Sequence, residues 1–328
     1  MTLPGARSTQ ATPRAAVGIF AHNEEATIRY VVEGFLGQRM RAASLCEVVV
    51  VCCGCTDDTV DMVKDVAASD ARVRLLVRPR REGKVAAINE FLSVVDADVL
   101  VLSSGDVVPA DDAIDRLVSP LAEDGQCMMT GPRVVMAKTW IPRRIVDHLH
   151  DVLWALHHAV SLHNPKLGEI VAIRSEVLQR HLPPGIHCDE ALMESIVVDQ
   201  GGSLGYVADA LVYNFAPTNV RELYRQRRRV AAQHVALRRL RGYRPSTTQP
   251  RLIFLALRSL PLRRFPLVLV LAGFETAARI HGYLDARRGR SYQLWRIARP
   301  PSRMDHLDVG SGTYRNETCA HADDERCA

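Results

Sequence analysis

Apolar runs alternate with amphipathic segments along roughly the first third of this 328-residue chain. Four short runs rich in Val, Leu and Ile predict strands buried on both faces of a sheet, over 15–20, 47–53, 72–77 and 98–102. The segments between them carry apolar residues at helical spacing, for example Ile28, Val31, Val32, Phe35 and Leu36. Strands that alternate with helices are typical of an α/β fold with a doubly wound, mostly parallel sheet.

The second half of the chain has a less regular pattern. We expect strands over 127–137, 168–173, 205–207 and 210–213, a helix over 145–162, and a second helix that opens within 186–192 and runs through Val198. A long arginine-rich helix is expected from Asn219, in a chain of net charge +5. Basic residues suit anionic ligands. Aromatic residues are few and no nucleic-acid-binding motif accompanies this helix, so we expect no nucleic-acid partner.

The region 252–284 is apolar, and 266–273 is almost purely so. Arginines flank this run at Arg258, Arg263, Arg264 and Arg279. The uninterrupted part is too short to cross a bilayer, which takes about 20 residues. Two interpretations stay open: a peripheral membrane segment with its arginines at the lipid headgroups, or a buried helical hairpin or homodimer contact. We expect a C-terminal apolar helical extension over 246–290, between polar, disordered tails at 1–14 and 291–328.

Composition places the chain among ordinary globular proteins, with 47% hydrophobic and 24% charged residues. The first 14 residues have no apolar core, so no signal peptide is expected. Eight cysteines without such a peptide indicate reduced thiols in the cytoplasm. Cys52, Cys53 and Cys55 lack the paired spacing of a zinc site. We expect a cytoplasmic protein, held peripherally at the inner face of the cell membrane if 252–284 contacts lipid.

The run 98–102 ends in Ser-Ser-Gly followed by a carboxylate, Asp106. Ligands of open α/β sheets bind outside the carboxyl ends of the strands, and Gly105 lets the backbone bend closely there. A carboxylate at this place suits Mg²⁺ shared with phosphate oxygens; the alternative is an Asp that caps the helix expected near Asp111. Neither G-x-G-x-x-G nor G-x-x-x-x-G-K-[ST] is present, which argues against a dinucleotide-binding domain and a P-loop enzyme.

Six segments resemble, in order, the motifs of one family. They are 17–25 (VGIFAHNEE) for an opening strand and N-E-E turn, 51–59 (VCCGCTDDT) for V-D-D-G-S-T-D-x-T, 83–89 (GKVAAIN) for G-K-x-x-A-L-N, 104–109 (SGDVVP) for D-x-D-x-x-P, 188–192 (CDEAL) for E-D-x-x-L, and 226–230 (QRRRV) for Q-x-x-R-W. Together they resemble the inverting family 2 glycosyltransferases of GT-A fold. The resemblance covers about 15–245, with a nucleotide-binding half over 15–110 and an acceptor half over 111–245.

The resemblance implies a role for each matching residue. The catalytic base is expected at Asp189, with Glu190 as the alternative because the two are adjacent. Without the other motifs, we would interpret this pair as acids favoured at a helix N-terminus by the helix dipole. Asp106 is the expected ligand of Mg²⁺ or Mn²⁺. Residues expected to bind the nucleotide-sugar donor are Ala21, Asn23, Glu25, Cys53, Asp57, Lys84, Gly105, Asp106, Gln226 and Arg229. Thr56 is expected to cap the helix after the second strand.

The chain departs from the family pattern at several positions. Ser104 replaces the first Asp of D-x-D, which leaves one clear carboxylate for a metal. Cys52 and Cys53 replace acids that in the family help to hold the nucleoside, so the preferred nucleobase of the donor is left open. Val230 replaces the Trp associated with processive synthases, which favours transfer of a single sugar from a nucleotide-sugar to an acceptor, either lipid-linked or a small molecule. The alternatives are a nucleotidyltransferase of similar fold and a degenerate, non-catalytic nucleotide-binding module.

Overall fold

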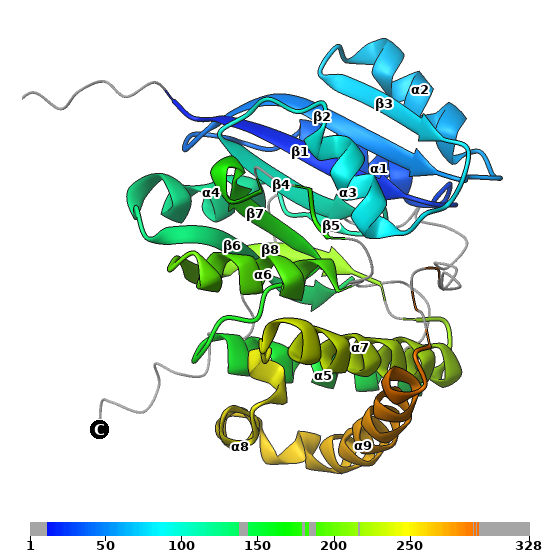
Figure 1. Ribbon diagram of the computed structural model, residues 1–328, viewed down its shortest axis with the longest axis vertical. Helices are drawn as coiled ribbons and strands as arrows, with labels where there is room; N and C mark the ends of the chain where they lie inside the picture. Colours follow the sequence, from blue (N-terminus) through cyan, green and yellow to red (C-terminus); the bar gives the residue numbers. More distant parts are fainter. Residues whose placement is uncertain are drawn as a thin grey trace, which may run out of the picture.

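A mixed, eight-stranded sheet is the centre of the computed structural model (Figure 1). The structure describes residues 12–137, 144–178, 181–183, 188–215, 217–290, 292 and 294. Among these the strand order is β3-β2-β1-β4-β7-β6-β8-β5. The tails expected over 1–14 and 291–328 lie almost wholly outside the described residues, although Arg14 already belongs to the first strand.

The first four strands are parallel, as the apolar runs predict. They are β1 (Arg14–Ala21), β2 (Ser44–Cys53), β3 (Val73–Arg78) and β4 (Val99–Ser104). Helices α1 (Ile28–Leu36), α2 (Thr59–Ser69) and α3 (Lys84–Leu92) connect them. Because these strands run in the same direction, the ends of β1, β2 and β4 meet at one edge of the sheet.

The second half continues the same sheet with strands of both directions. They are β5 (Val108–Pro109), β6 (Cys127–Met136), β7 (Ile170–Arg174) and β8 (Ser203–Asn214). β7 runs antiparallel to β4 and β6, whereas β6 and β8 are parallel. The prediction of two short strands over 205–207 and 210–213 was wrong, because β8 is continuous. Its register against β6 jumps from Val207 to Leu211, so an irregularity absorbs the intervening residues without ending the strand.

Apolar side chains on both faces of the sheet explain why the strands read as unbroken apolar runs. Val17 and Ile19 of β1 pack in a cluster that contains α1, α2 and α4 (Ala113–Glu123). Ala16 and Phe20 point the other way, into a cluster that contains α3 and α6 (Asp189–Asp199). Each fully buried Val or Ile side chain contributes about 1.5–3 kcal/mol to folding.

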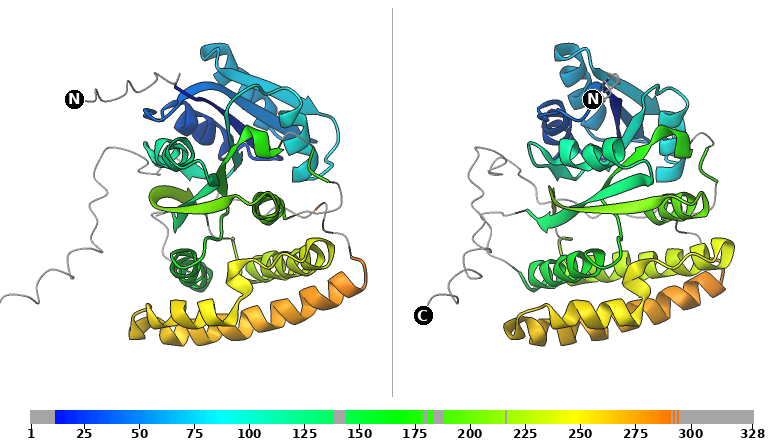
Figure 2. Two further views of the ribbon diagram at one scale, coloured as in Figure 1. Left: turned by 60° about the vertical axis from the view of Figure 1, so that its left-hand side comes forward. Right: turned by 90° about the vertical axis from the view of Figure 1, so that its left-hand side faces the viewer.

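A layer of helices lies next to the part of the sheet formed by β6 and β8, on the side away from β3 (Figures 1 and 2). It consists of α5 (Ile145–Ser161), α7 (Val220–Arg241), α8 (Pro250–Arg258) and α9 (Phe265–Arg287). The short 3₁₀ turns in the described chain are η1 (Ser175–Leu178), η2 (Ser246–Thr248) and η3 (Leu262–Arg264). α7 and α9 are in close contact: a Cβ on Gly282 would lie 2.6 Å from the carbonyl oxygen of Arg228. Arg228 also forms an ion pair with Asp285 at 2.6 Å.

The segment Leu262–Arg287 is longer than the apolar run 266–273 suggested. Among the described residues it is the one helical stretch that meets the length and hydropathy criteria for crossing a membrane, and 22% of its most apolar window is buried. The expectation that this region is too short concerned only the uninterrupted run, and the helix continues past Glu275 for three further turns. Glu275 forms an ion pair with Arg227 of α7 at 2.5 Å, so one face of α9 rests on the protein.

Candidate active site

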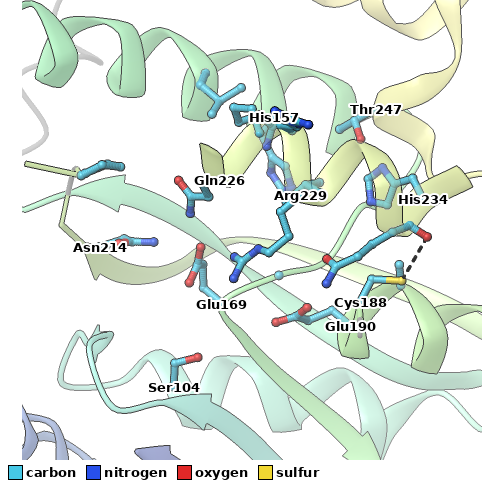
Figure 3. Close-up of a pocket in the computed structure, with 18 of the residues that line it drawn as sticks. Ser104, His157, Glu169, Cys188, Glu190, Asn214, Gln226, Arg229, His234 and Thr247 are labelled. Atoms are coloured by element: carbon cyan, nitrogen blue, oxygen red, sulfur yellow. Dashed lines mark hydrogen bonds between the residues drawn. The ribbon is translucent and has the colours of Figure 1, made fainter. Parts of the chain in front are cut away.

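A cavity of about 960 Å³ lies between the sheet edge and the helical layer. Ala21, Cys53 and Ser104 reach it from the ends of β1, β2 and β4, and Glu190 reaches it from the start of α6. Arg229 enters from α7 (Figure 3). The cavity therefore lies where the sheet topology predicts a ligand site.

Two adjacent acids and a lysine form an ionic cluster in this cavity. Lys84 Nζ lies 2.8 Å from Asp189 Oδ2 and 3.0 Å from Glu190 Oε1. Burial lowers the pKa of Lys84, but the two carboxylates outweigh burial and raise it. Burial and the neighbouring Glu190 raise the pKa of Asp189 to about 6. Burial also acts on Glu190, but Lys84 and Lys166 outweigh it and lower the pKa of Glu190 to about 2. Asp189 is therefore the better proton acceptor near neutral pH.

Two further carboxyl groups, those of Glu24 and Glu169, interact electrostatically with Asp106. Burial raises the pKa of Asp106, although Lys84 and Arg229 oppose the shift. Burial, and then Asp106 itself, raise the pKa of Glu24 to about 9 and that of Glu169 to about 8. Carboxylates that hinder one another's ionisation are stabilised when a cation binds among them.

This carboxylate group fits a divalent cation that is completed by its substrate. Among the described residues, no three His, Cys, Asp or Glu side chains are arranged to hold a metal by themselves. Mg²⁺ is commonly bound through one or two carboxylates plus substrate phosphates. Asp106, with Ser104 beside it on the cavity wall, provides that minimum. The residues present therefore fit Mg²⁺ or Mn²⁺ bound together with a diphosphate.

Helix α7 supplies cationic and amide groups to the cavity. Its N-terminus is capped by Asn219, whose side chain accepts a hydrogen bond from the Glu222 amide at 3.0 Å. Burial lowers the pKa of Arg229 to about 10, so the guanidinium stays charged at neutral pH. Figure 3 shows it pointing toward Glu169, with Gln226 one turn away.

Glu169 is a site residue that no motif indicated. It lines the cavity and has a φ of +66°. The Ile170 amide donates a hydrogen bond to the Gly168 carbonyl at 2.9 Å, which makes Glu169 the centre of a γ-turn with positive φ, a rare and strained form. Strained non-glycine residues persist where the surroundings hold them, often at functional sites. The carboxylate of Glu169 is thus fixed in the cavity by the turn that begins β7.

The structure brings together eight of the predicted site residues. Those that line the cavity are Ala21, Cys53, Lys84, Asp106, Asp189, Glu190, Gln226 and Arg229. Gly105 lies behind the described cavity wall, where an added Cβ would lie 3.1 Å from Glu24 and 3.2 Å from Ala21. Gly105 is thus closely packed against these two residues, and its predicted contact with the donor stays a prediction.

Asn23, Glu25 and Asp57 also lie outside the described cavity wall, and they join the loops after β1 and β2. Asn23 Oδ1 accepts a hydrogen bond from the Thr56 amide at 2.8 Å, and Glu25 accepts one from the Asp58 amide at 3.2 Å. Asp57 accepts one from the Glu25 amide at 3.2 Å. Thr56 was therefore wrongly predicted as a helix cap: α2 begins at Thr59, and the Thr56 side chain is bonded to Asn23.

The fold and the site together define a GT-A glycosyltransferase. The sheet is doubly wound and has a carboxylate after its fourth strand, an acid pair lies on a facing helix, and an arginine comes from a third element. Residues 16–175, just under half of the chain, match the model of the family Glycosyl transferase family 2, so this part of the chain is a member of that family. The fold expectation is thereby confirmed.

Similarity to individual proteins is more distant. The solved mannosyltransferase PcManGT from Pyrobaculum calidifontis, in complex with GDP-Man and Mn²⁺, has a TM-score of 0.61 and 20% identity, over 87% of this chain and 90% of that one. Glucosyl-3-phosphoglycerate synthase from Mycobacterium tuberculosis has a TM-score of 0.49 and 19% identity, over 70% and 85%. The glycosyltransferase AglD of Haloferax volcanii is 28% identical over 146 residues, 43% of this chain and 22% of that protein. The chain thus spans about a fifth of the length of this curated relative.

Proposed function

We propose that the protein is an inverting glycosyltransferase that moves one sugar from a nucleoside-diphosphate-sugar to an acceptor hydroxyl, with Mg²⁺ or Mn²⁺ at Asp106. One observation carries the proposal: Asp106, the Lys84–Asp189–Glu190 cluster and Arg229 line the same cavity. A group that binds the leaving diphosphate and a group that accepts a proton are thus placed on one reacting centre.

The leaving diphosphate is stabilised by positive charge at one end of the cavity. Arg229 keeps its charge and lies close enough to Asp189, Glu190 and Glu169 for their fields to oppose the effect of its burial. A fixed guanidinium binds phosphate oxygens in a planar, two-pronged geometry. When bound at Asp106, the divalent cation acts as a Lewis acid on the diphosphate.

Asp189 acts as the base in the transfer. The acceptor oxygen attacks the anomeric carbon of the sugar, the bond from that carbon to the diphosphate oxygen breaks, and Asp189 takes the proton of the acceptor hydroxyl. Attack from the side opposite the leaving group inverts the anomeric configuration. Lys84, 2.8 Å from Asp189, favours the ionised form of this base.

The first donor to test is GDP-mannose, because PcManGT was solved with GDP-Man and Mn²⁺. Cys53 lies on the cavity wall where the family motif has an acid, so the nucleoside is open to other bases. The experiment is calorimetric binding of GDP, UDP, TDP and CDP, each with and without Mn²⁺. Metal-dependent binding of one of them, lost in Asp106→Ala, supports the proposal and identifies the donor class. Absence of binding to all four would favour a degenerate module.

A further inference from the structure

The cavity extends well past the catalytic carboxylates into the helical layer. Three helices each present one face to this extension, which we call the chamber. Its wall includes His150, Leu153, Trp154, His157 and Val160 of α5, Ile253 and Leu257 of α8, and Val268, Leu271, Ala272, Glu275, Thr276 and Arg279 of α9. The spacing of three and four residues within each set shows that these are continuous helical faces. At about 960 Å³, the whole cavity is at the upper end of the range of about 300–1,000 Å³ for small-molecule sites.

We propose that the chamber binds the apolar chain of an amphiphilic acceptor whose hydroxyl-bearing head lies at Asp189. The inference rests on the proposed transferase function and names the acceptor class for that site. A sugar nucleotide is polar along its whole length and has no use for this wall. An aliphatic chain placed there removes apolar surface from water on both partners.

The polar groups in the chamber wall are compatible with an apolar ligand. Burial lowers the pKa of His150 to about 4 and that of His157 to about 3, so both rings are neutral at physiological pH. His150 Nε2 accepts a hydrogen bond from Trp154 Nε1 at 3.1 Å, which keeps the indole oriented. The histidines therefore add no charge that an aliphatic chain would have to displace.

Charged groups in the chamber leave a surplus of positive charge at one place. Glu275 lies 2.5 Å from Arg227 and 4.0 Å from Arg279, so two guanidiniums share one carboxylate. All three residues belong to the cavity wall. An anionic link such as a phosphate between head and chain complements this surplus.

Helix α9 is apolar on its outer side as well as toward the chamber. Leu269, Val270 and Ile280 of α9 are 70%, 56% and 55% exposed, and Leu262 of the preceding turn η3 is 82% exposed. Figure 2 shows α8 and α9 as the outermost layer of the molecule, on the side away from the sheet. Arg258, Arg263 and Arg264 flank the apolar stretch, which suits anionic headgroups. The chamber thus lies directly behind the surface at which the protein would meet a lipid layer.

The test measures binding of farnesyl phosphate, farnesol and inorganic phosphate by calorimetry, below the concentration at which the lipids aggregate. Ala272→Trp fills the chamber from an exposed wall position, and Val270→Trp adds the same kind of bulk on the opposite, outer face of the same helix. We expect saturable 1:1 binding of farnesyl phosphate, weakened about tenfold or more by Ala272→Trp and unchanged by Val270→Trp. Tighter binding of farnesyl phosphate than of farnesol would assign the Arg227–Arg279 pair to a phosphate.

Three results would overturn the inference. They are equal affinity for farnesyl phosphate and inorganic phosphate, equal loss in the two Trp variants, and failure of farnesyl phosphate to bind at all. Binding of nucleoside diphosphates with Mn²⁺ is measured on the same samples. If the nucleotides bind and the lipid does not, the transferase proposal stands and the acceptor class is wrong. If only the lipid binds, the chamber is a lipid site and the transferase proposal is wrong.

Discussion

Lys84 and Asp189 lie 2.8 Å apart as the first residues of α3 and α6. An acid at the start of a helix is favoured by the helix dipole, whereas a lysine there is disfavoured. The position of Lys84 is therefore explained by the acid pair that it faces and not by the stability of its own helix. The ion pair connects the third helix of the first half to the helix that carries the proposed base.

Replacing Lys84 is expected to affect stability and activity together. Lys84→Met leaves Asp189 and Glu190 buried without their main cation, which costs about 3–5 kcal/mol when a buried pair loses one partner. The check is the free energy of unfolding in urea at pH 7. Lys64→Met is the matched control, because its ion pair with Asp61 is exposed and is worth about 1 kcal/mol or less. Equal losses in the two variants would show that Lys84 has no special role.

The proposed base has a defined pH dependence. Asp189 accepts a proton only when ionised, and its pKa in the free protein is raised to about 6, so kcat/KM is expected to fall as the pH drops below about 6 and to level off above it. In Lys84→Met this fall moves to higher pH, because Lys84 lowers the pKa of Asp189. Asp189→Asn is expected to reduce kcat by about 10²–10⁴-fold while donor binding is kept. A larger loss in Glu190→Gln than in Asp189→Asn would assign the base to Glu190.

The sequence predicted the parallel half of the sheet and the residues at its edge. Buried parallel strands require apolar residues on both faces, so Val17 to Phe20 and their counterparts form runs that are easily recognised. Asp106 and Arg229 were found because they belong to short motifs with their own chemistry. The contact between Lys84 and Asp189 was not predicted, because it joins residues distant in the sequence.

Two parts of the site have no local sequence signal. Glu169 adopts a positive φ, which favours glycine, so its γ-turn is determined by the surrounding structure and not by local preference. The chamber was missed because 266–273 is apolar all round and shows no preferred face. Packing of Val268 and Leu271 inward distinguishes the face that lines the chamber.

Replacing Glu169 is expected to stabilise the protein and impair its activity. Glu169→Gly removes a positive-φ strain of about 1–3 kcal/mol from the folded protein. The resulting gain in stability is smaller by about 0.5–1 kcal/mol, because glycine has more freedom in the unfolded chain. The pKa of Glu169 is raised from 4.5 to about 8, so the wild type loses stability as the pH rises through this window, and the gain in Glu169→Gly is larger at pH 9 than at pH 5. Urea unfolding at both pH values and kcat/KM are the measurements. Glu169→Gln, which keeps the strain, is the control, and unchanged kcat/KM in both variants would exclude a role in the reaction.

Restoring the missing acid at Ser104 tests where the cation binds. Ser104 lies on the cavity wall at the end of β4, and Asp106 follows two residues later. Ser104→Asp adds a second carboxylate, so Mn²⁺ affinity is expected to rise by about tenfold, because affinity for such cations follows the charge of the ligand set. Without metal, the same variant is expected to lose about 1 kcal/mol of stability, because the new carboxylate repels Asp106. Calorimetric Mn²⁺ titration and urea unfolding with a chelator measure the two effects. Ser104→Asn has a similar size without the charge. If Ser104→Asp binds Mn²⁺ no more tightly than the wild type, the cation does not bind at this end of β4.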